Sequence, residues 1–277
     1  MNLLIKIAKN LDRKEYFSFR LWEFCLRNTV RFFPWYFLFA VLIRHPMTAL
    51  HGFKHYRKLV QKSPGQALHG TIILSTIFPI LRKNKKNNRR FILAPEFCMK
   101  PFDEEKRESV CPAGFFNHRC VIMERPDLLQ QKQENWPEPC NRCNIGKLAC
   151  LSARLHTDFY IMTSALDIAH DLFLPALQGT GAKMGLFLLC PYSAEAFTFG
   201  LATTGFKGAL LTFCKGDCRN YEEFTRADIG IKKKQTFIEQ RVFENLQKEL
   251  EECIKSVMTP SQKVPRYSRR SNVYRAE

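Results

Sequence analysis

Hydrophobic and polar residues alternate in blocks over the C-terminal half of the chain, and these blocks predict a series of strands and helices. Short apolar runs have the length and composition of buried strands, and the stretches between them repeat apolar residues at helical spacing. The strands are predicted at 158–163, 183–190 and 207–214, and the helices at 145–156, 165–178, 192–204 and 237–258. This alternation predicts an α/β fold, in which a small parallel sheet with right-handed connections forms the middle of three layers.

The N-terminal segment has a different pattern. Residues 1–62 repeat apolar positions at helical spacing, and the chain then continues to a charged loop at 82–90. Residues 1–90 contain eighteen Lys and Arg against three acidic residues, whereas the whole chain has a formal net charge of +17. A helical, basic N-terminal segment is therefore predicted beside a nearly neutral remainder, and such a segment favours a polyanionic partner.

Two apolar runs in this basic segment favour a membrane surface as the polyanion. The runs at 32–43 and 67–81 are shorter than the ~20 residues of a spanning helix, and Pro34 and Pro79 interrupt them. Aromatic, apolar stretches flanked by Lys and Arg are typical of helices that lie in the interface or insert shallowly. We expect an anionic membrane surface as the partner, and we consider nucleic acid the weaker interpretation. A core helix with a solvated basic edge is the alternative.

The N-terminus shows no convincing secretory signal, so we expect a cytoplasmic protein that is peripheral to, or shallowly inserted in, the inner membrane. Its cysteines are then expected to be reduced, and an odd total of eleven also argues against a disulfide framework. Three regions are predicted: a membrane-surface segment at 1–90, a Cys-rich α/β metal-binding domain at 91–258 and a disordered, polar tail at 259–277. Within the second region, residues 91–143 have little periodicity and are expected to form a loop that a metal holds in place.

Eight of the eleven cysteines lie between Cys111 and Cys218, and their positions predict a thiolate site. Cys140 and Cys143 have the two-residue gap that lets one turn present both sulfurs, and Cys143 precedes a predicted helix whose N-terminus favours thiolate. Other candidates end two predicted parallel strands, whose carboxyl ends open into one crevice. The full set of predicted ligands is Cys111, Cys120, Cys140, Cys143, Cys190, Cys214 and Cys218.

The remaining cysteines are expected to pack as small hydrophobic side chains. This interpretation applies to Cys25, Cys98, Cys150 and Cys253. The basic run at 232–234 is interpreted mainly as a solvated face, although it has the charge to hold an anion over the crevice.

The cysteine pattern also resembles a known family. The motif Cys140-Asn-Arg-Cys143, the Leu-Leu-Cys190-Pro sequence and the pair Cys214 and Cys218 are similar to the cysteine-rich prokaryotic family named domain of unknown function 116. The resemblance covers about residues 105–235 and excludes the N-terminal segment. It implies a set of seven cysteines and membrane association, and it implies no reaction.

The number of candidate ligands favours an iron–sulfur cluster over zinc, because seven cysteines exceed one zinc site. The sequence thus predicts a membrane-associated protein with a thiolate-bound metal centre. If the protein is an enzyme, redox chemistry or electron transfer with an unknown protein partner is expected. Two alternatives remain open: a zinc-stabilised, non-enzymatic interaction module, and a metal-free thiol redox protein in which Cys140 and Cys143 cycle.

Overall fold

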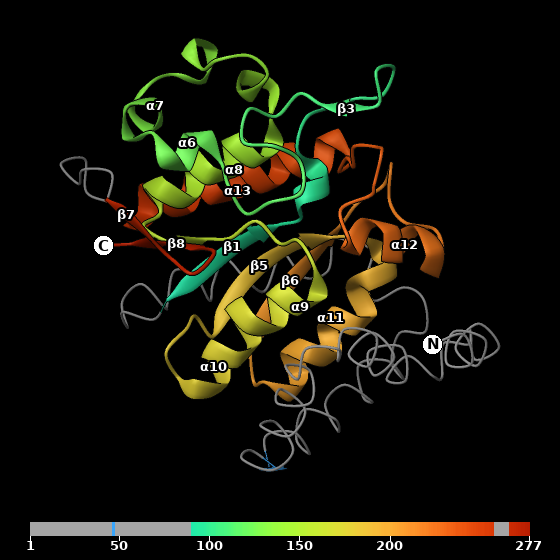
Figure 1. Ribbon diagram of the computed structural model, residues 1–277. Helices are drawn as coiled ribbons and strands as arrows, with labels where there is room; N and C mark the ends of the chain where they lie inside the picture. Colours follow the sequence, from blue (N-terminus) through green and yellow to red (C-terminus); the bar gives the residue numbers. More distant parts are fainter. Residues whose placement is uncertain (1–45, 48–89, 258–265) are drawn as a thin grey trace.

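The structure, a computed structural model, describes residues 46–47, 90–257 and 266–277, and these form an α/β fold around one mixed sheet (Figure 1). Six strands lie in the order β6-β5-β1-β4-β8-β7, and the first four are parallel. The strands are β1 (Phe91–Pro95), β4 (Asp158–Phe159), β5 (Met184–Leu189), β6 (Lys207–Thr212), β7 (Tyr267–Arg270) and β8 (Val273–Ala276). A separate two-stranded ribbon pairs β2 (Phe102–Asp103) with β3 (Glu108–Ser109).

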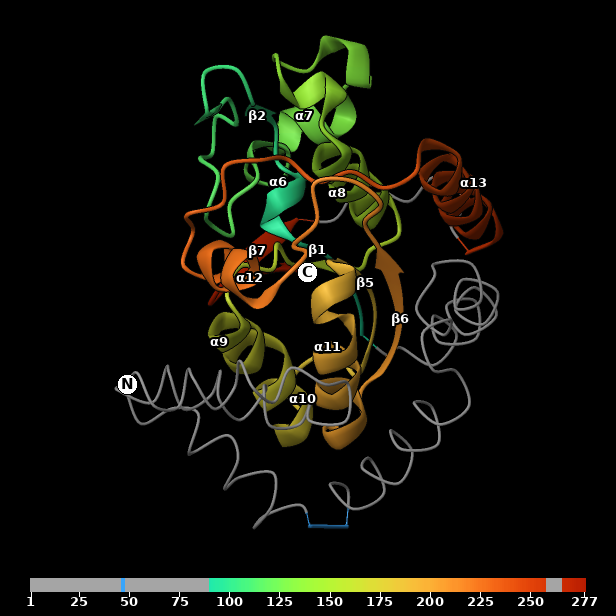
Figure 2. The same ribbon diagram turned by 90° about the vertical axis from the view of Figure 1, so that its right-hand side faces the viewer.

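Helices cover both faces of this sheet (Figures 1 and 2). One face carries α6 (Val121–Glu124), α7 (Pro126–Gln130), α8 (Asn144–Arg154) and α13 (Gln240–Val257). The other carries α9 (Ala165–Ile168), the π-helical turn η7 (Ala169–Phe173), α10 (Leu174–Gln178) and α11 (Pro191–Thr203). Three 3-10 turns, η4 (Phe97–Met99), η5 (Gln133–Asn135) and η6 (Cys140–Arg142), and the helix α12 (Tyr221–Asp228) lie in the connections.

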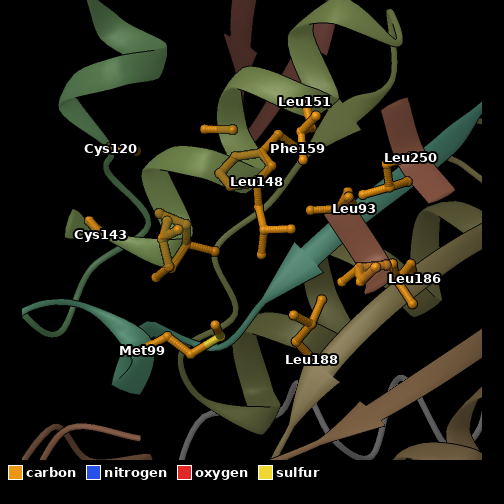
Figure 3. Close-up of a cluster of buried hydrophobic side chains, with 14 of the residues drawn as sticks. Leu93, Met99, Cys120, Cys143, Leu148, Leu151, Phe159, Leu186, Leu188 and Leu250 are labelled. Carbon is orange, nitrogen blue, oxygen red and sulfur yellow. The ribbon is translucent and has the colours of Figure 1, made fainter. Parts of the chain in front are cut away.

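Strand alternation divides the core into two clusters. Leu93 and Leu186 face the layer of α8 and α13, whereas Ile92 and Phe187, their chain neighbours, face the opposite layer. Successive side chains of a strand point to opposite faces, so a strand covered on both sides must be apolar throughout. Figure 3 shows the first cluster, which extends from Leu250 of α13 to Met99.

The apolar positions of helix α13 follow the helical repeat and are buried against the core. Phe243, Leu246, Leu250 and Cys253 recur three or four positions apart, and all four are buried, while charged residues occupy most of the other face. Each fully buried large side chain contributes about 1.5–3 kcal/mol relative to an exposed one, so this stripe accounts for several kcal/mol of docking energy.

The predicted α/β class and the strands β5 and β6 are confirmed, whereas β4 contains only the first two residues of the strand predicted at 158–163. The sheet is mixed and larger than predicted. The central strand β1 lies in the part of the sequence for which a loop was predicted. The disordered tail was a wrong prediction for residues 267–276, which form the antiparallel strands β7 and β8 at the sheet edge.

Strand order determines where a ligand crevice is expected. After β1, the chain adds β4 on one side of it and then crosses back to add β5 on the other side. The carboxyl ends of β1 and β5 therefore form a topological switch point, where open α/β sheets usually bind ligands. Glu96 and Cys190 follow these two strands directly.

The predicted membrane-surface segment at 1–90 lies almost entirely outside the described residues, so its interpretation stays a prediction. Within the part of the chain that the structure describes, no helix has the length and apolarity needed to cross a membrane.

Candidate functional site

Four of the predicted ligands line one small cavity beside α8. The first cysteine cluster consists of Cys111, Cys120, Cys140 and Cys143, which come from three separate segments and share a cavity of about 10 Å³. The cavity is also lined by Lys100 and Arg119 and by apolar side chains. The CxxC turn, which was the strongest local signal in the sequence, thus lies beside two cysteines that are 20 or more positions away.

Two of these thiols lie at helix N-termini. Cys143 is the N-cap of α8, at the end of the turn η6, and Cys120 is the N-cap of α6; Figure 3 shows Cys143 at the start of its helix. Burial raises the pKa of each thiol to about 12. The backbone amides at the start of each helix partly oppose this effect and lower the pKa, because their positive ends favour thiolate.

A buried lysine completes the surroundings of the first cysteine cluster. Only 1% of the Lys100 surface is exposed, and its Nζ donates hydrogen bonds to Gly114 O and Asn117 O at 2.9 Å and to Asn117 Oδ1 at 2.8 Å. Desolvation lowers the pKa of Lys100 to about 8, while Cys111 and the other nearby thiols act in the opposite direction. The ammonium group thus holds the loop that carries Cys111 and adds positive charge next to the sulfurs.

The C-terminal strand β8 also supports the first cysteine cluster. The hydroxyl of Tyr274 accepts a hydrogen bond from the amide of Cys120 at 3.1 Å and donates one to Glu124 Oε1 at 3.0 Å. Residues from the far end of the chain therefore fix the position of a thiol in the 91–143 region.

Three other cysteines form a second cluster at the topological switch point. The second cysteine cluster consists of Cys98, Cys190 and Cys218, and all three are at most 3% exposed. A cavity of about 20 Å³ touches all of them. It is also lined by Glu96, Phe97, Thr163, Phe224, Ala227, Asp228 and Lys232.

Hydrogen bonds connect the members of this second cluster. The amide of Cys218 donates to Cys190 Sγ at 3.1 Å, and Lys232 Nζ donates to Cys218 Sγ at 3.8 Å. Glu96 accepts from the Cys190 amide at 3.3 Å and from Cys98 Sγ at 3.4 Å. Four segments of the chain thus meet in one buried polar network.

The charges in this network are unequal. Burial raises the pKa of the Glu96 carboxyl and of the Cys98 thiol, which favours their neutral forms. The pKa of Cys218 is lowered, first by the hydrogen bond from the Cys190 thiol and then by the nearby Lys232 ammonium. Burial lowers the pKa of Lys232, but the surrounding thiols and Glu96 outweigh that effect and raise it overall. The network therefore favours negative charge at Cys218 over the other thiols, beside the Lys232 ammonium group.

Cys214 lies outside both cavities and is exposed, although it was expected beside Cys190. The strand register explains this. Leu189 pairs with Thr212, so Phe213 is opposite Cys190 and faces the same core, and Cys214 points to the other face. A shift of one residue along a strand reverses the direction of the side chain.

The loop that returns from Cys214 to Cys218 is tightly constrained. Gly216 has a φ of +72°, and a Cβ at this position would lie 1.9 Å from Gln235 O. Lys215 pairs with Phe237 in an isolated bridge on the same loop. Only glycine fits this close approach between the backbone at residue 216 and that of Gln235. The turn places Cys218 in the lining of the second cavity.

Sequence reasoning did not place three residues that line the second cavity at a site. Cys98 was interpreted as packing only, Lys232 as part of a solvated face, and Glu96 was not considered. Lys232 is 6% exposed, whereas Lys233 beside it is exposed. The unrecognised strand β1 carried the missing signal, because recognising it would have placed residues 96–98 at the switch point beside Cys190.

Six of the seven predicted ligands are therefore divided between two cavities, and one segment connects the cavities. Glu96 and Cys98 line the second cavity, while Lys100, two residues further on, lines the first. Among the described residues, no group of three or more His, Cys, Asp or Glu side chains is already arranged to hold a metal ion. Metal binding therefore stays a prediction that rests on the chemistry of the lining residues.

Comparisons with protein-family models, with curated proteins and with solved structures found no match to this chain. The resemblance to domain of unknown function 116 accordingly stays a prediction.

Proposed function

We propose that this protein binds one soft metal ion, best matched by zinc, through the first cysteine cluster, and that the ion holds the loops of residues 97–143 against α8. The observation that carries the proposal is the convergence of four thiols from three segments on one cavity. Four thiolates around a metal are a common structural zinc site, and such a site stabilises loops that have little core of their own.

The size of the cavity supports a single ion over an iron–sulfur cluster. About 10 Å³ is roughly the space that one water molecule needs. A zinc ion lies about 2.3 Å from each sulfur and needs no more room than this. A four-iron cluster contains four irons and four sulfides, so it requires the four thiols to move apart. The proposal therefore favours the zinc alternative over the iron–sulfur cluster expected from the sequence.

Charge and hydrogen bonding also fit a tetrathiolate ion. Zinc with four thiolates has a net double negative charge, and the ammonium group of Lys100 offsets part of it. The backbone amides at the starts of α6 and α8 also favour thiolate at Cys120 and Cys143.

Metal analysis of the full-length protein, purified anaerobically, tests the proposal. We expect one equivalent of zinc per chain, colourless protein and no acid-labile sulfide. C143S should lose the zinc, whereas C214S, which changes an exposed cysteine outside both cavities, should retain it. Stoichiometric iron and sulfide would instead support the cluster, and zinc retained by both C143S and C120S would refute the assignment.

Association with an anionic membrane surface through residues 1–90 is a separate proposal, supported by the charge and apolar runs of that segment. Flotation with liposomes that contain anionic lipid, compared with neutral liposomes, tests it. Equal flotation with both would contradict an electrostatic contribution.

A further inference from the structure

The second cysteine cluster contains a pair of thiols that the proposed metal site does not use. Cys190 and Cys218 come from the carboxyl end of β5 and from the loop after β6, and they meet at the switch point of the sheet. The amide of Cys218 lies 3.1 Å from Cys190 Sγ, and both cysteines line the same small cavity. Two buried sulfurs are thus held next to each other, at the place where α/β proteins usually bind ligands.

The surroundings prepare one of these sulfurs as a nucleophile. Lys232 Nζ lies 3.8 Å from Cys218 Sγ and is itself buried, so its charge is poorly screened and favours thiolate at that sulfur. The same ammonium group disfavours a second metal cation in the cavity. Cys190 keeps its proton, because the hydrogen bond to the Cys218 sulfur raises its pKa.

We propose that Cys218 and Cys190 are a redox-active dithiol that reduces a small hydroperoxide and forms an internal disulfide. Cys218 is the attacking thiolate, and Cys190 is the resolving thiol. A reactive thiolate beside a second thiol is the arrangement that converts sulfenic acid into a disulfide.

The chemistry balances with hydroperoxide as the oxidant. The Cys218 thiolate attacks one oxygen of hydrogen peroxide, the O–O bond breaks, and the leaving oxygen takes a proton to become water. Glu96, which lines the cavity and has a pKa raised by burial, is the proton donor. The Cys190 sulfur then attacks the sulfenic sulfur, and the hydroxyl leaves with the Cys190 proton as a second water. Two sulfurs are oxidised, one peroxide is reduced, and an external dithiol reductant regenerates the pair.

The size of the cavity selects the oxidant. Its volume of about 20 Å³ accommodates a molecule little larger than water, and α12 contributes Phe224 and Ala227 to its lining. Hydrogen peroxide meets this limit, whereas oxidised glutathione does not. We therefore expect oxidation by the small reagent and little reaction with the large one.

Peptide mapping of the native, full-length protein tests the proposal without a mutation. After one equivalent of hydrogen peroxide and blocking of free thiols, trypsin should release residues 184–207 joined to 216–219 by a disulfide. Cleavage after Lys215 separates Cys214 from Cys218, so the linkage is unambiguous. Cys218 left reduced, or a disulfide confined to Cys140 and Cys143, would overturn the proposal.

Matched variants test the contribution of each group. C190S should stop at the sulfenic acid of Cys218, which a dimedone adduct records, and C214S should form the disulfide normally. K232M should slow oxidation at neutral pH by about tenfold or more relative to K233M, which changes the exposed neighbour. Equal rates for K232M and K233M would overturn the proposal. Zinc content is measured on the same samples, so failure of the metal site and failure of the dithiol are distinguished.

Discussion

Substitution of Lys100 by Met separates the electrostatic contribution of this residue from its structural one. K100M keeps the apolar stem and removes the ammonium group. Without metal, two effects oppose each other. The carbonyls of Gly114 and Asn117 lose their donor, at about 1–3 kcal/mol each. Burial lowers the pKa of Lys100 from 10.5 to about 8, so the charged form destabilises the folded state. Removing the ammonium group therefore restores about 3 kcal/mol of folding stability. Asn117 Oδ1 keeps the hydrogen bond from the Arg119 amide.

The free energy of unfolding of metal-free K100M should therefore fall by no more than about 3 kcal/mol. Zinc binding has no such compensation, because the tetrathiolate ion loses the nearest buried positive charge. Loss of a group that supports a metal centre typically costs about 10–100-fold in affinity, and we expect a change of this size.

Two measurements check this prediction: urea unfolding of the metal-free protein, and zinc competition with a chromophoric chelator at pH 7. K106M is the matched control, because Lys106 is an exposed lysine of the same loop region. If K100M bound zinc within about threefold of K106M, the electrostatic contribution assigned to Lys100 would be refuted, whatever the change in stability.

Three further predictions concern the fold around the two clusters. G216A should lower the free energy of unfolding in urea by several kcal/mol, because its Cβ would clash with Gln235 O. G179A has a similar φ and open space around the Cβ, so it should cost only about 1–2 kcal/mol. Equal losses for the two variants would contradict the clash. Burial raises the pKa of Asp228 from 3.8 to about 7, so its contribution to stability is present below pH 4 and is lost as pH rises through 7. D228N should therefore be more stable than the parent at pH 8 by about 1–2 kcal/mol, after allowance for solvent screening, and the difference should vanish at pH 4. Y274F leaves the buried amide of Cys120 without its acceptor, so it should lower the free energy of unfolding by about 1–3 kcal/mol. It should also weaken zinc binding. An unchanged zinc affinity would show that β8 does not position the Cys120 thiol.

The later strands could be predicted from sequence because each is an apolar run between helical repeats. β5 and β6 match the predicted ranges within one or two residues at each end. β1 was missed because its five residues end in proline and precede a region rich in Pro, Cys and charge. β7 was missed because it is an edge strand of polar and basic residues, and β8 was missed because only four residues form it within the same polar, basic segment.

The candidate site was predictable only in part, for a related reason. The two-residue gap between Cys140 and Cys143 is local, so the sequence identified it directly. The division of the cysteines into two cavities depends on strand order and register, which no local pattern specifies. Cys214 and Lys232 illustrate the limit: a one-residue offset exposes the first, and a loop folded over the sheet buries the second.

The stretch from Glu96 to Lys100 has a consequence for regulation. Five consecutive residues supply one ionisable side chain to each cavity, and the 3-10 turn between them is buried. If occupancy of the metal site changes the ease of disulfide formation, oxidation must change the affinity for the metal by the same factor. Oxidation of the dithiol would then change the affinity for the metal, and bound metal would change the redox equilibrium of the dithiol.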